Sequence, residues 1–361
     1  MSIFFYILQL ENIKRYDSMN SNIINLESSL KNRIFGQDNV IEEVINTLYI
    51  SMAGLHEQNK PIASFLFMGS TGVGKTELVK ELAKELGMHL ERFDMSEYAD
   101  KYSARNLTGA QKGLVGYEAG GLLTNAIKKN PNSILLLDEV EKAHKDIYNT
   151  FLQVLDYGIL TDTKGEKIDF SQTIIIMTSN LGTTDKPKVN EFMTPEFINR
   201  IDKILKFNNL TKELNMNIVS KFLNDFSQIL GKKNIKLSIT ERAKEYLNEI
   251  GFDPKMGARS VKRTINNEFK THIAKEILFG KLVNQGKVSI DYISGNFIYD
   301  YSEINNAKKS SYKPFESPFD KDFIPSDFDF ETYAEAVTYA KNHQDVAITR
   351  ASSGYGYIIK R

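Results

Sequence analysis

A glycine-rich segment that ends in Lys and Thr has the composition of a phosphate-binding loop. Residues 69–76 read Gly-Ser-Thr-Gly-Val-Gly-Lys-Thr, which fits the pattern G-x-x-x-x-G-K-[ST]. Glycines allow backbone N–H groups to curl around phosphate oxygens, and the N-terminus of a following helix adds a favourable dipole. In such a loop Lys75 reaches the β- and γ-phosphates, and the Thr76 hydroxyl ligates Mg²⁺. The candidate nucleotide-binding residues are Gly69, Ser70, Thr71, Gly72, Val73, Gly74, Lys75 and Thr76.

Two acidic residues follow a short apolar run further along the chain. Residues 134–137 read Ile-Leu-Leu-Leu, and Asp138 and Glu139 come directly after them. A strand that ends in an acid delivers a carboxylate to the metal, so Asp138 is the second candidate Mg²⁺ ligand. Glu139 is placed to orient and polarise an attacking water. Two acids at a helix N-terminus are common by themselves, but beside a phosphate loop they indicate ATP hydrolysis, with water as the nucleophile.

Alternating strands and helices must position these motifs. The expected strands cover residues 64–67, 90–95, 134–137, 173–178 and 204–207. Helical periodicity lies between them, and residues 77–86 show it well, with Gly87 as a C-terminal cap. This order predicts an α/β fold in which a five-stranded parallel sheet has helices on both faces. The unalternating run at 134–137 predicts a central strand.

Beyond Thr211 the pattern becomes mostly helical and predicts a second domain. One apolar stripe repeats every four residues, at Val261, Ile265, Phe269, Ile273 and Ile277. A short strand at 287–292 ends this domain. Prolines then indicate a linker, and a small α+β appendix follows, with a helix at 331–343 and a hairpin of strands 346–349 and 355–359. The expected division is an N-terminal arm (1–25), a large domain (26–210), a helical small domain (211–295), a linker (296–330) and the appendix (331–361).

Charge balance and the lack of cysteine exclude several kinds of function. The sequence has 46 basic and 46 acidic residues, which gives no support for a nucleic-acid partner bound through its phosphates. Cysteine is absent, which excludes disulfides, cysteine-ligated zinc and thiol nucleophiles and fits a cytoplasmic protein. The apolar residues 3–8 are too short to span a bilayer and lack the flanks of a signal peptide, so no membrane partner is expected.

Seven short segments match one known family in chain order. They are 34–37, 69–76, 92–98, 138–144, 178–180, 195–200 and 256–259. Together they resemble the AAA+ ATPases of the Clp group, most of all the second ATPase module of ClpA and ClpB. A generic phosphate-loop protein would share only two of these segments. The resemblance implies the P-loop AAA+ fold with a helical lid domain, ATP and Mg²⁺ as cofactors, and a ring of identical subunits, which is a hexamer in this family.

The resemblance also implies roles for single residues. Asn180 matches sensor 1, which helps to hold the attacking water; by itself it would be taken for a turn residue. Arg200 matches the arginine finger that reaches the γ-phosphate in a neighbouring subunit, with a solvated surface arginine as the plain alternative. Arg259 matches sensor 2 on the small domain. Ile34 and Phe35 match the segment that lines the adenine pocket, and a core role explains them equally well.

Two departures from the family pattern concern partners. The substrate-gripping pore loop reads Gly-Leu-Val-Gly at 113–116 where the family has Gly-Tyr-Val-Gly, so the expected pore residues are Leu114, Val115 and Tyr117. Leu114 keeps apolar bulk but lacks the flat ring. The Ile-Gly-Leu or Ile-Gly-Phe tripeptide that docks on the ClpP protease is absent from 181–194. The resemblance therefore does not extend to ClpP docking by the usual contact.

The sequence thus favours a Clp-type motor that uses ATP to unfold, thread or remodel protein substrates, in particular unfolded or tagged ones. Two alternatives remain at this level. The first is a regulatory or interaction subunit of a Clp ring without threading activity, which the changes at Leu114 and in the docking segment suggest. The second is an AAA+ remodeller of nucleic acid, against which the zero net charge argues.

Overall fold

The protein is described here from a computed structural model. The described residues are 25–57, 59–109, 119–181, 192–254, 256–283 and 285–302, with short strands at 328–330, 347–350 and 357–360. The chain divides into two compact units, residues 1–304 and 305–361. The expected arm up to residue 24, the pore residues Leu114, Val115 and Tyr117 and the expected helix at 331–343 lie outside the described residues.

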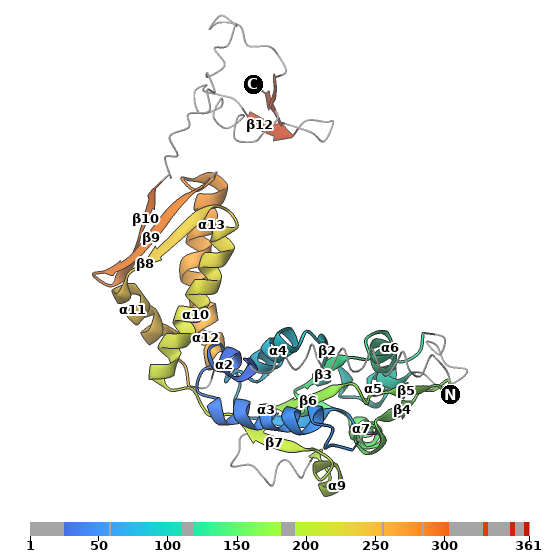
Figure 1. The fold of residues 1–361 in the computed structure, drawn as a ribbon. Coiled ribbons are helices and arrows are strands. Elements are labelled where there is room, and N and C mark those ends of the chain that lie inside the picture. Colours follow the sequence, from blue (N-terminus) through green and yellow to red (C-terminus); the bar gives the residue numbers. More distant parts are fainter. Residues whose placement is uncertain are drawn as a thin grey trace, which may run out of the picture. The chain divides into compact units, whose positions relative to one another are not determined.

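A five-stranded parallel sheet forms the centre of the large domain (Figure 1). Its order is β2 (His89–Asp94), β3 (Ser133–Asp138), β6 (Ile174–Ser179), β1 (Ala63–Met68) and β7 (Lys203–Lys206). Strands β1, β3 and β6 are buried along their whole length, as expected for central strands with both faces covered. The prediction of a five-stranded parallel sheet is confirmed. Because the strands are parallel, the residues that follow β1, β3 and β6 meet at one edge.

Helices cover both faces of this sheet, and the strand side chains alternate between two cores. Phe65, Phe67 and Leu136 pack with helices α2 (Leu26–Lys31), α3 (Asp38–Met52) and α4 (Lys75–Leu86). Leu66, Leu135 and Met177 pack on the other face. That face is covered by α5 (Lys101–Thr108), α6 (Leu122–Lys129), α7 (Lys145–Tyr157) and the short α9 (Pro195–Ile198). The single-turn helices η1 (Met95–Tyr98) and η2 (Val140–Lys142) and the two-stranded hairpin β4 (Ile159–Thr161) and β5 (Lys167–Asp169) complete the domain.

Helix α4 shows why the phosphate loop opens into a helix at this point. Its apolar residues Leu78 and Leu82 lie on one fully buried face, as the sequence period predicts. Gly87 follows in the left-handed conformation, with φ of 64°, and caps the C-terminus. Glycine at position 74 also has a positive φ, so the chain can turn sharply before Lys75 begins the helix.

The small domain combines four helices with a sheet that the sequence only partly predicts. The helices are α10 (Lys212–Gly231), α11 (Glu241–Gly251), α12 (Ala258–Ile265) and α13 (Thr271–Phe279), with a π-helical turn η3 (Asn266–Lys270) between the last two. The predicted stripe from Val261 to Ile273 is buried in their core. The sheet has the order β10 (Asn296–Ser302), β9 (Gly286–Ile293) and β8 (Ile235–Ile239). Strand β9 confirms the expected strand at 287–292.

Two sequence expectations are wrong at this sheet. Residues 296–302, assigned to the linker, form β10 and pair with β9 over its full length. Strand β8 was not expected at all. Both strands alternate apolar and polar residues: Phe297, Tyr299 and Tyr301 pack on the domain core while the residues between them face outward. So short a half-buried pattern resembles a polar loop.

The second unit contains an antiparallel three-stranded sheet of order β11 (Phe328–Phe330), β13 (Tyr357–Lys360) and β12 (Ala347–Arg350). In the register of β12 and β13, Ile348 lies opposite Ile359, so the expected hairpin is confirmed. Strand β11 lies within residues 296–330, where a linker was expected. Within the described part of the chain, no helix is both long enough and apolar enough to span a bilayer.

Candidate nucleotide-binding site

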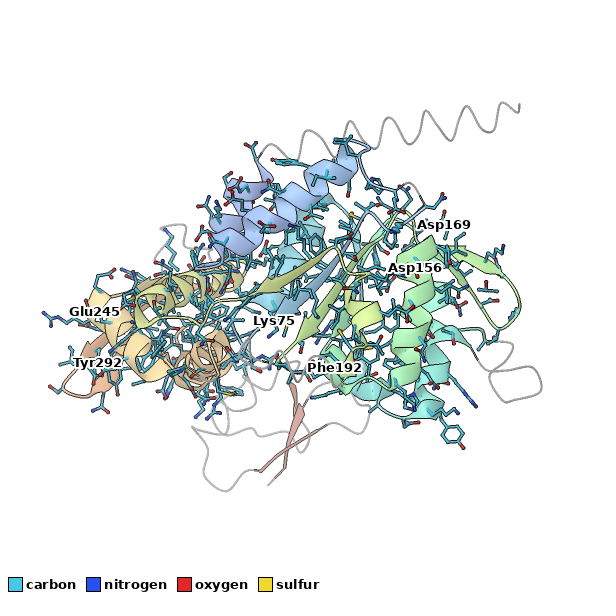
Figure 2. All side chains as sticks on the ribbon, turned by 90° about the horizontal axis from the view of Figure 1, so that it is seen from below. Lys75, Asp156, Asp169, Phe192, Glu245 and Tyr292 are labelled. Atoms are coloured by element: carbon cyan, nitrogen blue, oxygen red, sulfur yellow. The ribbon has the colours of Figure 1, made fainter. Side chains whose placement is uncertain are left out.

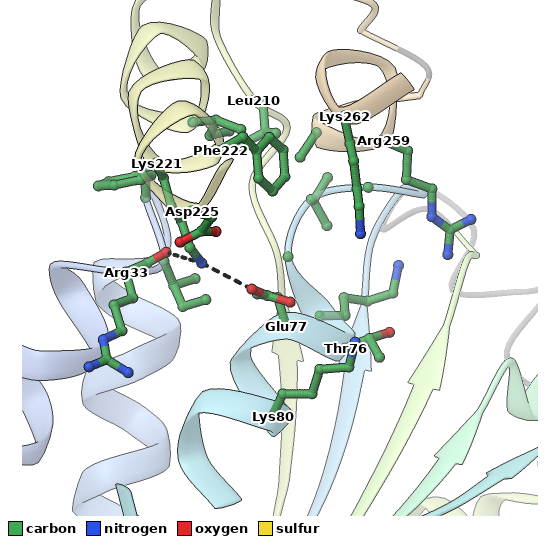
Figure 3. Close-up of a pocket in the computed structure, with 18 of the residues that line it drawn as sticks. Arg33, Thr76, Glu77, Lys80, Leu210, Lys221, Phe222, Asp225, Arg259 and Lys262 are labelled. Atoms are coloured by element: carbon green, nitrogen blue, oxygen red, sulfur yellow. Dashed lines mark hydrogen bonds and ion pairs between the residues drawn. The ribbon is translucent and has the colours of Figure 1, made fainter. Parts of the chain in front are cut away.

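One pocket of about 550 Å³ gathers most of the predicted site residues (Figure 3). The predicted residues that line it are Ile34, Phe35, Gly72, Val73, Gly74, Lys75, Thr76, Asp138, Glu139, Asn180 and Arg259. They come from the edge of the sheet where β1, β3 and β6 end, from the connection between α2 and α3, and from helix α12 of the small domain. Gly69, Ser70 and Thr71 lie in the same loop but do not line the pocket. Arg200 does not line it either.

The phosphate loop contacts the small domain through two glycines. Gly72 has a φ of 80°, and a Cβ atom there would lie 2.1 Å from the Met256 carbonyl oxygen. Gly257 has a φ of 54°, and its Cβ would lie 2.6 Å from the Gly72 oxygen. The Ala258 N–H donates to that same oxygen at 3.0 Å. Only glycine allows both backbones to approach this closely, so the loop and the start of α12 depend on each other.

Lys75 is buried at the centre of the loop. Its ammonium donates to the carbonyl oxygens of Gly69 at 2.6 Å and Ser70 at 2.9 Å, and to Asn180 Oδ1 at 3.2 Å. Burial lowers the pKa of Lys75 to about 8, although nearby carboxylates, first Glu141, oppose this. Lys75 is thus held on the floor of the pocket, where phosphate oxygens could replace the carbonyl groups as its partners.

Asp138 is held from two sides at the end of β3. The Thr178 hydroxyl donates to its Oδ1, and the Arg92 guanidinium donates to its Oδ2 from Nη2 at 2.7 Å and from Nε at 3.1 Å. No role of Arg92 was predicted from the sequence, although Arg92 begins one of the matched segments. Its contact with Asp138 joins residues 46 positions apart, and only the pairing of β2 with β3 brings them together.

The side-chain oxygen atoms of Thr76 and Asp138 are suitable ligands for a magnesium ion. Carboxylate and hydroxyl oxygens suit Mg²⁺, which proteins bind through one or two carboxylates together with substrate phosphates. Nearby, Oε2 of Glu141 is buried and has no hydrogen-bond partner among the described residues, although Glu141 itself does not line the pocket. The described residues contain no group of three or more His, Cys, Asp or Glu side chains that could hold a metal ion by themselves.

Glu139 occupies a strained and closely surrounded position. It has a left-handed backbone, with a φ of 57°, which is uncommon for a residue other than glycine. Asn180 Nδ2 donates to its Oε1 at 2.9 Å, and the Lys142 ammonium donates to its Oε2. The Lys142 contact is the main cause of the lowered pKa of Glu139. The predicted base and the predicted sensor 1 residue are therefore direct neighbours.

Glu141 and Lys142 are contacts that the sequence analysis missed. The backbone N–H of Asn180 donates to Glu141 Oε1 at 3.0 Å, which fixes the end of β6 beside η2. Lys142 follows Glu139 by three residues, so the turn η2 brings their side chains together. The three-residue spacing of Glu139 and Lys142 was the sequence signal for this contact. It indicates a contact only if the residues form a helical turn, and that turn was not predicted.

The other end of the pocket is more apolar. Ile34 is buried in the large-domain core and Phe35 packs against the small-domain core, while both line the pocket. Ile34 and Phe35 therefore contribute to the hydrophobic cores and also line the pocket. Leu210, Ile218 and Phe222 add apolar surface from the start of the small domain. The aromatic base of a nucleotide would fit this end of the pocket, and the phosphates of the nucleotide would then point toward Lys75.

Arg200 lies at a separate place, after α9. It forms an ion pair with Asp156 near the C-terminus of α7, and 38 % of its side chain is exposed. Figure 2 shows Lys75 between the two domains and Asp156 on α7, away from it. Arg200 therefore lies outside the pocket of its own chain.

Comparison with known proteins identifies two family matches in this region. Residues 60–204 match the AAA domain of the Cdc48 subfamily, and residues 210–290 match the C-terminal, D2-small domain of ClpB protein. The chain is 41 % identical over 306 residues to the ClpA homolog protein of Fuscovulum blasticum, a match that covers 80 % of this chain and 39 % of that protein. It is 44 % identical over 306 residues to the chaperone protein ClpB of Clostridium perfringens, covering 79 % and 35 % of the two chains.

A third relative is the ATP-dependent Clp protease ATP-binding subunit ClpE of Lactococcus lactis. The identity is 44 % over 273 residues, which cover 70 % of this chain and 36 % of ClpE. The chain thus spans about two fifths or less of the relatives it matches. The two matched families occur in the order of the two domains described above, on either side of one pocket. The chain belongs to the Clp group of AAA+ ATPases, with an AAA domain followed by a ClpB-type small domain.

Proposed function

We propose that the pocket binds ATP with Mg²⁺ and hydrolyses it. The observation that carries this proposal is the meeting of Lys75, Asp138, Glu139 and Asn180 at one edge of the sheet, inside a single pocket. Lys75 and the loop amides would bind the phosphates, and Asp138 with the Thr76 hydroxyl would hold the metal ion. Bound Mg²⁺ would neutralise charge on the phosphates.

The chain's own side chains suit the proton transfer of hydrolysis. Glu139, which is ionised at neutral pH as carboxylates ordinarily are, would accept a proton from the attacking water. Asn180, which already donates to Glu139, would help to orient that water. Arg259, with Lys262 beside it on α12, would contact the nucleotide from the small domain (Figure 3).

We further propose that the cycle drives the unfolding or remodelling of protein substrates. The names of the relatives, chaperone protein ClpB and Clp protease ATP-binding subunit ClpE, support this reading over a nucleic-acid remodeller or a purely regulatory subunit. In this proposal the chain works as a homo-hexamer, Arg200 completes the site of its neighbour, and Leu114, Val115 and Tyr117 contact substrate. The cysteine-free composition fits the cytoplasm.

The test is ATP-dependent unfolding of a tagged fluorescent protein, followed by loss of fluorescence with and without added ClpP. We expect loss of fluorescence that requires ATP and does not require ClpP. If ATP is hydrolysed but no unfolding occurs with any tag or partly unfolded substrate, the regulatory-subunit alternative is favoured. ATPase stimulation by DNA and not by unfolded protein would instead favour the nucleic-acid remodeller.

A further inference from the structure

Lys221 lines the pocket and joins three of the elements around it. It lies on α10 of the small domain, and its side chain is only 18 % exposed. Its ammonium donates to Glu77 Oε1 on α4 at 3.0 Å and to the backbone oxygen of Arg33 at 3.2 Å. Glu81, one turn further along α4, lies 3.9 Å away. The dashed lines of Figure 3 mark the contacts with Arg33 and Glu77.

Each of these contacts neighbours a residue expected to touch nucleotide. Glu77 follows Thr76, the last residue of the phosphate loop, and Arg33 precedes Ile34 and Phe35 at the apolar end of the pocket. The Arg33 side chain is itself bonded to Glu81 and lies 3.2 Å from Glu85, both on α4. One ammonium therefore links the small-domain helix to both ends of the site.

The charges around Lys221 give the linkage a direct effect on an anionic ligand. Glu77 lines the pocket directly after the phosphate loop and pairs with Lys221, whereas Glu81, one turn further along α4, does not line the pocket and also pairs with Arg33. Lys221 is a counter-ion to both. Without it, the Glu77 carboxylate would lose its cationic partner and repel the nucleotide, whereas Glu81 would keep Arg33, and the partly buried Arg33 oxygen would lose its donor.

We propose that Lys221 is a positioning residue that clamps the small domain onto the phosphate-loop helix and the base-binding segment, and thereby sets how long bound nucleotide is retained. The proposal rests on the nucleotide site proposed above. Lys221 touches none of Lys75, Asp138, Glu139 or Asn180, so it is expected to affect retention of nucleotide and not the hydrolysis step.

The test measures release of a fluorescent ADP analogue with Mg²⁺ from the full chain. In Lys221→Met we expect release to be roughly two- to tenfold faster and KM for ATP to rise correspondingly, with kcat within about twofold of wild type. Lys221→Arg should restore retention. The double variant Glu77→Gln/Lys221→Met should lose less binding free energy for the analogue than the two single variants lose together, because the two side chains are coupled. The matched control is Lys244→Met, because Lys244 is also partly buried, with 29 % of its side chain exposed, and its ion pair is with Glu241 in the same helix, α11.

A second readout follows the clamp itself. The chain has no cysteine, so Lys145→Cys on α7 and Glu245→Cys on α11 can carry a pair of fluorophores (Glu245 is labelled in Figure 2). Added nucleotide should narrow the distribution of energy-transfer efficiencies between the two fluorophores in the labelled chain that keeps Lys221. It should narrow this distribution less in the labelled chain that also carries Lys221→Met.

Three results would overturn the inference: equal release from wild type and Lys221→Met, an equal change in Lys244→Met, or a fall in kcat with unchanged retention. Failure of the wild-type chain to bind the analogue would instead count against the proposed nucleotide site.

Discussion

At the scale of single residues, the site is a set of charges whose partners come from distant parts of the sequence. Asp138 meets Arg92 and Thr178, and Glu139 meets Asn180 and Lys142. Each oxygen of Glu139 already accepts a hydrogen bond from a side chain. An attacking water would have to share or replace one of these partners, so the proposed base must rearrange during the cycle.

The lowered pKa of Lys75 predicts how the free energy of unfolding changes with pH. Its pKa is about 8 in the folded chain, below the ordinary value of 10.5, because burial disfavours the charged form. Between these values the unfolded chain binds more protons, so the free energy of unfolding rises with pH in that range. The difference between wild type and Lys75→Met should increase by up to about 3 kcal/mol from pH 8 to 10.5.

Urea denaturation of the nucleotide-free proteins at several pH values measures this difference. Because the other groups titrate in both proteins, their contributions cancel. A difference that stays constant across this range would mean that Lys75 is not desolvated in the folded chain.

At the scale of elements, the contact between the phosphate loop and α12 predicts a specific glycine requirement. Gly257→Ala would place a Cβ 2.6 Å from the Gly72 oxygen and would weaken the bond from Ala258. Gly54→Ala is the matched control, since Gly54 has a φ of 71° and nothing within 4 Å of an added Cβ. Gly54→Ala should cost about 1–2 kcal/mol in backbone strain. Gly257→Ala should cost more, because its φ of 54° and ψ of −140° suit only glycine and its Cβ would clash with the Gly72 backbone.

Only Gly257→Ala should also weaken nucleotide binding, by roughly tenfold if the whole contact is lost. Titration with a fluorescent nucleotide and denaturant unfolding separate the two effects. Equal affinities for Gly54→Ala and Gly257→Ala would show that the approach of α12 to the loop does not matter for binding.

The elements also show how far sequence could predict this structure. Strands β1, β3 and β6 and helix α4 were predicted because their residues are buried in unbroken apolar runs or in a helical pattern. Strand β10 was not, because alternate residues such as Phe297 and Tyr299 are only partly buried and the residues between them are exposed. Local patterns report burial, and a half-exposed short strand has too little of it.

The candidate site was predictable to the same extent. Lys75, Thr76, Asp138 and Glu139 belong to motifs that are contiguous in sequence, and all four line the pocket. The roles of Arg92, Glu141 and Lys221 depend on contacts between elements far apart in the chain, for example Lys221 and Glu77, which are 144 positions apart. No local pattern carries that information.

At the scale of the whole molecule, the second unit predicts where the chain can be shortened. We propose that residues 305–361 serve in docking a partner or substrate and are not part of the motor. A chain ending at Ile304 should keep basal ATP turnover and assembly but lose activity on native substrates. A chain ending at Asp300 should be less stable by about 1–2 kcal/mol, because Tyr301 pairs with Val288 in the small-domain sheet.

Denaturant unfolding, ATP turnover and sedimentation of the two shortened chains measure these effects. Loss of turnover in the chain ending at Ile304 would place the second unit within the motor. Equal stability of the two chains would mean that the end of β10 contributes nothing to the small domain.

A ring with a shared site predicts complementation between defective subunits. Arg200 lies outside its own chain's pocket, so a complete site would take Glu139 from one subunit and Arg200 from the next. Mixtures of Arg200→Ala and Glu139→Gln chains should regain ATP turnover that neither has alone, highest near equal proportions. Mixed rings without any regained turnover, with mixing shown by sedimentation or native mass, would exclude a finger acting between subunits.

The most direct test of ATP hydrolysis at this pocket is to measure binding and turnover of ATP together in Glu139→Gln. The change keeps the shape of the side chain and its contact with Asn180 but removes the carboxylate. We expect ATP affinity within a few fold of wild type and turnover lower by about 10²–10⁴-fold, the usual contribution of a general base. Lys75→Ala should instead lose affinity. Hydrolysis at the wild-type rate by Glu139→Gln would contradict the assignment of the pocket.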